Sequence, residues 1–118
     1  NAKCNNVKNI DFYNADAGQF MVEMAEYRAD AKTGEKNGAD EVDVVFMDPP
    51  RTGSDTRFLS CLTRLAPSRI VYISCGPDTL ARDLKYLTRK GYVVERMTGV
   101  DLFPMTKHCE VVCGLSRK

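Results

Sequence analysis

Residues 69–84 read RIVYISCGPDTLARDL, and they predict a buried strand that turns sharply into a helix. The first six residues, 69–74, are largely apolar and β-branched, as in a strand covered on both faces. Pro77 suits the first position of a helix, and Gly91 is typical of the position just after its end, near residue 90. Leucines at helical spacing predict the inward face of this helix: Leu80, Leu84 and Leu87.

The turn between this strand and helix carries a thiol, Cys75. In an open α/β sheet, ligands collect outside the carboxyl ends of the strands, and the next helix points its amino terminus at the same place. Backbone N–H groups and the helix dipole there favour the thiolate, which is scarce in a free cysteine with a pKa of about 8.5. Cys75 is therefore a candidate nucleophile. A cysteine at such a turn is about as often a small buried hydrophobe.

The flanking pattern predicts an α/β fold. The last two strands follow each other without a helix, so we expect them to pair antiparallel at the end of an otherwise parallel sheet. The expected elements, in chain order, are the end of a helix at 1–7, a strand at 9–13, a helix around 20–27, a surface loop at 31–41, a strand buried on both faces at 42–47, a helix from a cap at Ser54 or Asp55 to Pro67, the strand at 69–74, the helix at 77–90, and strands at 92–100 and 109–115.

Composition limits the function classes. The 118 residues fit one domain, and 17 Lys and Arg against 16 Asp and Glu leave a net charge of +1, so a nucleic-acid surface must be a local patch. The five cysteines contain no C-x-x-C pair, which argues for reduced thiols rather than a disulfide framework or a zinc site. No apolar run approaches the ~18–20 residues of a membrane span. We expect a cytoplasmic protein without a membrane segment.

Three segments that carry polar and reactive side chains fall at strand ends or in the loops beside them, namely 48–51 (DPPR), 74–77 (SCGP) and 103–110 (FPMTKHCE). Asp48 and Glu110 are carboxylates that such a fold brings near Cys75, which gives a nucleophile and a proton acceptor. Each residue has a structural alternative as well. Asp48 can cap a turn, and Glu110 can be a solvated edge residue. His108 is more often a structural residue, and Arg51 is suited equally to a phosphate or to a carboxylate.

Taken together, these motifs resemble the S-adenosylmethionine-dependent RNA uracil-5-methyltransferases. Order and spacing match over essentially the whole chain. Two departures are Gly76, where the family usually has asparagine, and Leu102, where it has methionine. The segments that carry the resemblance are 48–51 (DPPR), 72–77 (YISCGP), 79–83 (TLARD), 101–104 (DLFP) and 108–110 (HCE).

The resemblance implies a Rossmann-like methyltransferase sheet and a mechanism. Cys75 would add to carbon 6 of uracil, and Glu110 would remove the proton from carbon 5 after methylation. Asp48 would line the cofactor and uracil site, and Asp16 would contact the adenosine part of S-adenosylmethionine. The substrate would be ribosomal RNA or, as the second choice, tRNA.

The resemblance also implies that 1–118 is the carboxyl-terminal part of a single catalytic domain. The first strands and the glycine-rich cofactor loop would precede Asn1, so the strand at 9–13 would not neighbour the one at 42–47. The other four strands would form one block. The fragment alone would then be inactive. Two alternatives remain open: a methyltransferase that acts on an amino nitrogen, which needs no cysteine, and a non-catalytic RNA-binding module.

Overall fold

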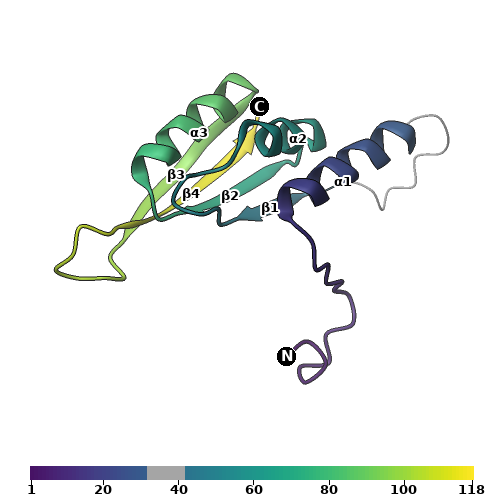
Figure 1. The fold of residues 1–118 in the computed structure, drawn as a ribbon, viewed down its shortest axis with the longest axis horizontal. Helices are drawn as coiled ribbons and strands as arrows, with labels where there is room; N and C mark the ends of the chain where they lie inside the picture. The colour runs from purple at the N-terminus through teal and green to yellow at the C-terminus, as the bar shows by residue number, and fades with distance from the viewer. Residues whose placement is uncertain (32–41) are drawn as a thin grey trace.

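The computed structural model describes residues 1–31 and 42–118, and the side chains of 28–31 are left out of the description. Figure 1 shows the fold of these residues. The loop predicted at 31–41 lies outside the described residues, except for the last residue of the first helix. The elements are α1 (Ala17–Ala31), β1 (Val44–Met47), α2 (Thr56–Leu65), β2 (Arg69–Ser74), α3 (Pro77–Arg89), β3 (Tyr92–Val100) and β4 (Glu110–Arg117).

The four described strands form one sheet in the order β1-β2-β4-β3. β1 and β2 are parallel, and β4 is antiparallel to both of its neighbours, β2 and β3. Three strands therefore run in one direction and the last strand runs in the other, which confirms the predicted α/β sheet with an antiparallel last strand. Because β4 enters the sheet between β2 and β3, its first residues lie beside the carboxyl end of β2.

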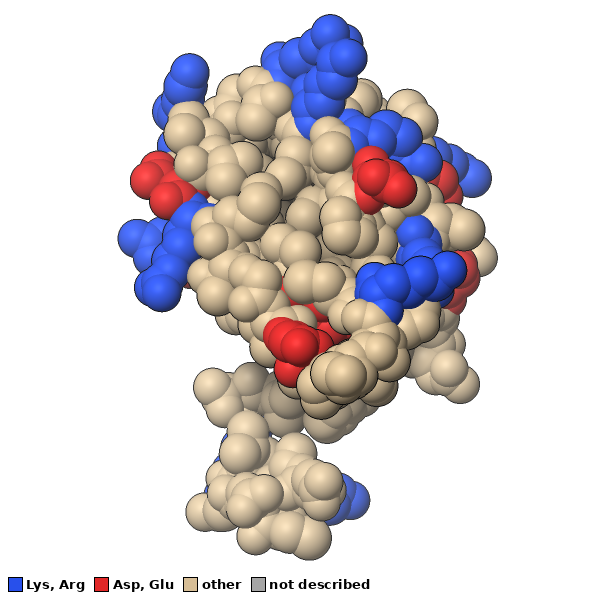
Figure 2. All heavy atoms as spheres, turned by 90° about the vertical axis from the view of Figure 1, so that its left-hand side faces the viewer, with Lys and Arg blue, Asp and Glu red and all other residues tan. Residues whose placement is uncertain are grey.

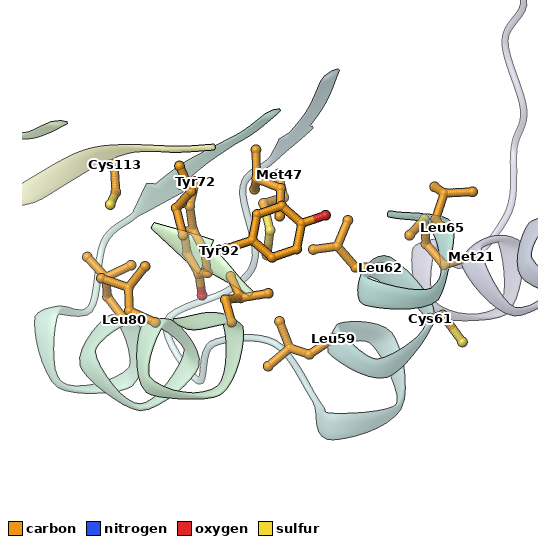
Figure 3. Packing of buried hydrophobic residues seen from close by; sticks show 14 of the residues in the cluster. Met21, Met47, Leu59, Cys61, Leu62, Leu65, Tyr72, Leu80, Tyr92 and Cys113 are labelled. Atoms are coloured by element: carbon orange, nitrogen blue, oxygen red, sulfur yellow. The ribbon is translucent and has the colours of Figure 1, made fainter. Parts of the chain in front are cut away.

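The three helices lie along one face of the sheet in the order α3, α2, α1 (Figure 1). Figure 3 shows leucines of α2 and α3 packed against side chains of the strands, with Tyr72 between the two layers. The predicted inward leucines of α3 are buried, and this confirms their helical spacing. In α2 the buried leucines are Leu59, Leu62 and Leu65. The residues with the least exposed side chains in this core are Leu62, Ile70, Tyr72, Leu87 and Cys113.

Local signals set the ends of the helices. Asp55 is the N-cap of α2, and its side chain accepts a hydrogen bond of 2.6 Å from the backbone N–H of Phe58. Pro77 begins α3, where its missing N–H costs no helical hydrogen bond. Gly91 follows α3 with φ +96, a conformation that glycine adopts without steric strain. The positions predicted for these signals are confirmed.

Two predictions at the amino-terminal end are wrong. Residues 2–6 form turns instead of the end of a helix, and 9–13 is irregular, with Phe12 77% and Tyr13 69% exposed. A β-strand is stable only beside another strand, because its N–H and C=O groups bond across the ladder. No strand of the described residues lies next to this segment. α1, in contrast, is longer than predicted and begins at Ala17.

β1 is shorter and more exposed than predicted. It begins at Val44, and Phe46 is 72% exposed although Met47 is buried. β1 is an edge strand in the described part of the chain, so the face and edge that a further strand would cover are open. The expectation of a strand buried on both faces is therefore wrong for this structure.

The core leads to a prediction about stability. Leu62 on α2 has no exposed surface, so Leu62→Ala is expected to lower the free energy of unfolding by about 2–5 kcal/mol through lost burial and the cavity left behind. The matched control is Leu102→Ala, because Leu102 is 61% exposed. Urea denaturation measures both. Equal effects of the two substitutions would contradict the packing described above.

Candidate functional site

The candidate site lies at the end of the sheet where β1 and β2 finish and β4 begins. β1 ends at Met47 and is followed directly by Asp48, and β2 ends at Ser74 and is followed by Cys75. In Figure 1 this is the end from which the loop between β3 and β4 projects. The fold thus brings the three polar segments of the sequence to the same end of the sheet, as expected for the carboxyl ends of parallel strands.

The strand register brings Cys75 and Glu110 together. β2 and β4 pair antiparallel up to Ser74 opposite Val111; Cys75 directly follows Ser74, and Glu110 directly precedes Val111. Residues directly opposite each other project from the same face of a sheet. Ser74 and Val111 are buried, whereas Cys75 and Glu110 are both partly exposed. The candidate nucleophile and the candidate base therefore lie at the same end of two adjacent strands.

Arg51 contacts both α3 and the loop before β4. The hydroxyl of Thr79, in the first turn of α3, donates a hydrogen bond of 2.9 Å to the backbone carbonyl of Arg51. The guanidinium of Arg51 lies 2.8 Å from Nδ1 of His108, in the loop before β4. The residue that Arg51 contacts through its side chain in this structure is thus an imidazole. This contact gives His108 a structural partner next to Glu110.

Gly76 allows the loop after β1 to approach the turn that holds Cys75. A Cβ atom at this position would lie 2.8 Å from the backbone oxygen of Arg51 and 2.8 Å from Oγ1 of Thr79. Both distances are shorter than real Cβ contacts, so any larger residue forces the two segments apart. The Gly76 N–H also donates a hydrogen bond of 3.1 Å to Oγ of Ser74. The departure at Gly76 noted in the sequence thus coincides with a close backbone approach.

Asp16 and Asp48 line one cavity of about 580 Å³ between α1 and the loop that follows β1. Its size is within the range of small-molecule sites. One oxygen of Asp16 has a structural role as well, because it accepts a hydrogen bond of 3.0 Å from the N–H of Gln19 and so caps α1. The other lining side chains are mainly apolar or aromatic and include Phe20, Met21, Phe46, Pro49 and Phe58.

The sequence interpretation assigned no role to Asp83, which the structure buries completely beneath this loop. Its carboxylate accepts hydrogen bonds from the N–H of Ser54 at 2.8 Å and from the hydroxyl of Tyr72 at 2.7 Å. The sequence did contain a signal. Asp83 lies three residues after Leu80 and four before Leu87, so an acidic residue occupies the apolar stripe of α3. A buried carboxylate at such a position requires hydrogen-bonding partners.

Burial and the nearby Asp83 carboxylate raise the pKa of Tyr72 well above its ordinary value. The folded state therefore keeps a proton that the unfolded chain loses near pH 10. The contribution of Tyr72 to the free energy of unfolding is fully present below that pH. It falls as the pH rises toward the pKa of the folded state, by up to about 1.4 kcal/mol per pH unit for one group.

We expect Tyr72→Phe to remove part of this alkaline loss. The measurement is the free energy of unfolding in urea at about pH 8 and about pH 11. Tyr27→Phe is the control, because the side chain of Tyr27 is 67% exposed. A loss in Tyr72→Phe as large as in the unsubstituted protein would contradict the assignment.

Figure 2 looks at the site end of the molecule, and there the Lys and Arg side chains form separate groups around the edge of a mostly uncharged surface. Within residues 1–31 and 42–118, no group of three His, Cys, Asp or Glu side chains is placed to hold a metal ion. In the same residues, no helix has the length and apolar character needed to cross a membrane.

Comparison with known proteins gives a family match over the whole chain. The model of the family described as tRNA (Uracil-5-)-methyltransferase matches residues 1–118. An uncharacterized RNA methyltransferase of Clostridium tetani is 39% identical over 118 residues, which is 100% of this chain and 23% of that protein. One from Geobacter sulfurreducens is also 39% identical, over 100% of this chain and 22% of that protein. The chain thus spans about a quarter of the length of these relatives.

Solved structures give a similar result. The structure of Pyrococcus abyssi tRNA (uracil-54, C5)-methyltransferase in complex with S-adenosyl-L-homocysteine matches with a TM-score of 0.59 and 34% identity, and the match covers 85% of this chain and 27% of that one. The structure of M1.HpyAVI matches with a TM-score of 0.61 over 90% of this chain and 54% of that one, but at 18% identity. That second likeness concerns the fold alone.

Proposed function

This chain belongs to the tRNA (uracil-5-)-methyltransferase family, and on that premise we propose that it forms the carboxyl-terminal part of an enzyme that methylates carbon 5 of a uridine in RNA. The methyl donor is S-adenosylmethionine, and the nucleophile is Cys75. Ribosomal RNA is the first substrate to test. tRNA is the second, since the Pyrococcus abyssi neighbour is a tRNA enzyme. We place the reaction in the cytoplasm, where free thiols stay reduced.

The observation that carries the proposal is the register of β2 and β4. The pairing ends at Ser74 opposite Val111, so Cys75 and Glu110 lie at the same end of two adjacent strands, the end at which β1 is followed by Asp48. A packing cysteine is buried, whereas Cys75 is partly exposed at this end of the sheet. A nucleophile that must later be released needs a base in this position.

The chemistry follows from these two groups. Carbon 5 of uracil is a weak nucleophile, and the Cys75 thiolate activates it by forming a C–S bond at carbon 6, which moves electron density to carbon 5. When bound, S-adenosylmethionine supplies the methyl group that carbon 5 takes. Glu110 then accepts the proton of carbon 5, and the electron pair of that C–H bond restores the C5–C6 double bond as the C–S bond breaks. Cys75 leaves as a thiolate, ready for the next uridine.

The cavity beside Asp48 fits the donor as far as the described residues define it. Carboxylates at two points, Asp16 and Asp48, offer acceptors for hydroxyl or amino groups, and the apolar side chains between them suit a purine ring. We propose that Asp16 contacts the adenosine part and that Asp48 lies at the border between donor and uracil.

The test is nucleoside analysis of RNA treated with the full-length protein and methyl-labelled S-adenosylmethionine. We expect the label in 5-methyluridine. Label in a methylated amino nitrogen would point instead to an amino-directed methyltransferase, and RNA binding without any label would point to a non-catalytic module. Either outcome would overturn the proposal.

Residues 1–118 alone are expected to transfer no methyl group above background. The cavity is bordered by the open edge of β1, and Phe46, which lines it, is 72% exposed, so this chain supplies only one side of a donor site. The assay is the same label transfer, with the full-length protein as the positive control. Clear turnover by 1–118 would show that the donor site is complete within these residues.

A further inference from the structure

We propose that Asp83 is a positioning residue for the methyl transfer reaction: with Arg82 and Tyr72 it holds the loop after β1 against the strand that carries Cys75. The inference rests on the proposed function for its effect on rate. Its structural part stands on hydrogen bonds, on burial and on one close backbone approach. We call residues 52–54 the clamped segment.

The carboxylate of Asp83 connects three elements. It projects from α3, and its Oδ2 accepts one hydrogen bond from the hydroxyl of Tyr72 on β2 and another from the backbone N–H of Ser54. The side chain of Asp83 has no exposed surface, and among the described residues no buried side-chain polar atom lacks a partner. A buried carboxylate is costly to desolvate, so a network of this kind is stable only when each oxygen is satisfied.

Arg82 completes this network from the solvent side, and we call Asp83, Arg82 and Tyr72 together the clamp. Its Nε donates to Oδ1 of Asp83 at 2.9 Å, and one terminal nitrogen lies 2.8 Å from the same oxygen. That nitrogen also donates to the backbone carbonyls of Thr52 at 3.1 Å and Ser54 at 2.9 Å. One guanidinium thus bonds both the carboxylate and the two carbonyls that flank Gly53. The planar guanidinium has several N–H donors in a fixed arrangement and can make these bonds together, whereas a lysine ammonium cannot reproduce this arrangement.

Gly53 shows how closely the clamped segment lies on this pair. Its φ is +74, and a Cβ atom there would lie 2.6 Å from Arg82 and 2.8 Å from Oδ2 of Asp83. The segment therefore takes a left-handed turn that glycine allows, directly over the buried charge. This approach brings the Thr52 and Ser54 backbone groups within reach of the clamp.

The clamp reaches the site through two short connections. Tyr72 lies three residues before Cys75 on β2, so its hydroxyl ties the clamp to the strand of the nucleophile. On the other side, the clamped segment follows Arg51, and the ring-fixed φ angles of Pro49 and Pro50 make the link back to Asp48 stiff. The clamp therefore sets the distance between the Cys75 turn and the Asp48 side of the cavity. A misplacement of about 1 Å in such a geometry costs on the order of 10²-fold in rate.

The test uses the full-length protein and compares Asp83→Asn and Tyr72→Phe with Asp78→Asn, a matched change at an exposed residue of the same helix. Two quantities are measured at a temperature at which circular dichroism shows every variant folded. One is the single-turnover rate of methyl transfer per folded molecule. The other is amide hydrogen exchange, followed by mass spectrometry, in 48–55 and in the strands β2 and β4.

We expect Asp83→Asn to slow methyl transfer by about 10–100-fold and Tyr72→Phe by about 3–10-fold. In both, exchange should rise in 48–55 and stay unchanged in β2 and β4, and Asp78→Asn should change neither quantity. Tyr72→Phe keeps the test decisive if Asp83→Asn does not fold.

Unchanged hydrogen exchange in 48–55 would overturn the proposal, and so would an increase of the same size in β2 and β4. A loss of methyl transfer that disappears when the rate is expressed per folded molecule would overturn it as well. These outcomes are separate from a failure of the proposed function. If the unsubstituted protein forms no 5-methyluridine, the proposed reaction is wrong, while the exchange comparison still decides whether the clamp holds the loop.

Discussion

Cys75→Ala is expected to abolish uridine methylation by the full-length protein, with a loss of at least about 10³-fold in rate. Without a thiolate at carbon 6, carbon 5 has no means of becoming nucleophilic, so no other residue replaces this step. Cys75→Ser is the stricter variant, because it keeps nearly the same shape while the hydroxyl stays protonated at neutral pH. Both are measured as label transfer to RNA under single-turnover conditions.

The matched control is Cys4→Ala, which removes an exposed thiol from the amino-terminal segment and should leave the rate unchanged. Methylation that survives in Cys75→Ala at more than a few per cent of the normal rate would remove the cysteine from the mechanism. An amino-directed methyltransferase would then become the better account, because that chemistry uses the lone pair of the substrate itself.

Glu110→Gln is expected to separate the two halves of the reaction. The amide is nearly isosteric with the carboxylate, but it cannot accept the proton of carbon 5, so the methylated adduct should form and then release about 10²–10⁴-fold more slowly. The adduct should accumulate as a protein–RNA species on a denaturing gel. It should appear with ordinary uridine, without any inhibitor.

Glu95→Gln serves as the control, because Glu95 is an exposed carboxylate on β3 that accepts a hydrogen bond from Ser116. It should turn over normally and trap nothing. If Glu110→Gln also turns over normally, Glu110 is the solvated edge residue considered from the sequence, and another group must remove the proton.

The sequence predicted those parts of the fold that depend on local patterns. The strand at 69–74, the helix from Pro77 and the last two strands have strong periodicity and clear end signals, and the structure has them at nearly the same bounds. Two of the failures, at 9–13 and at the exposed face of 42–47, depend on a neighbouring strand. A hydrophobic pattern shows that a segment can pair, but the partner is a property of the tertiary fold.

The candidate site was predictable from the sequence to a similar extent. Cys75, Asp48 and Glu110 stand in recognisable motifs at strand ends, so the sequence indicates them. The contact of Arg51 with His108 joins residues 57 positions apart and has no local signal. The clamp was predictable in part, because an aspartate on a leucine stripe indicates a buried, bonded carboxylate. Its partners on β2 and in the loop were not, since they meet Asp83 only in the folded structure.

The most direct measurement of the central claim uses RNA that contains 5-fluorouridine, incubated with the full-length protein and S-adenosylmethionine. Fluorine at carbon 5 leaves no proton to remove after methylation, so release stops and the C–S bond persists. We predict a stable adduct that requires the methyl donor, maps by peptide mass spectrometry to Cys75 and is absent in Cys75→Ser. Methylation of the RNA without an adduct, or an adduct on any other residue, would contradict the account.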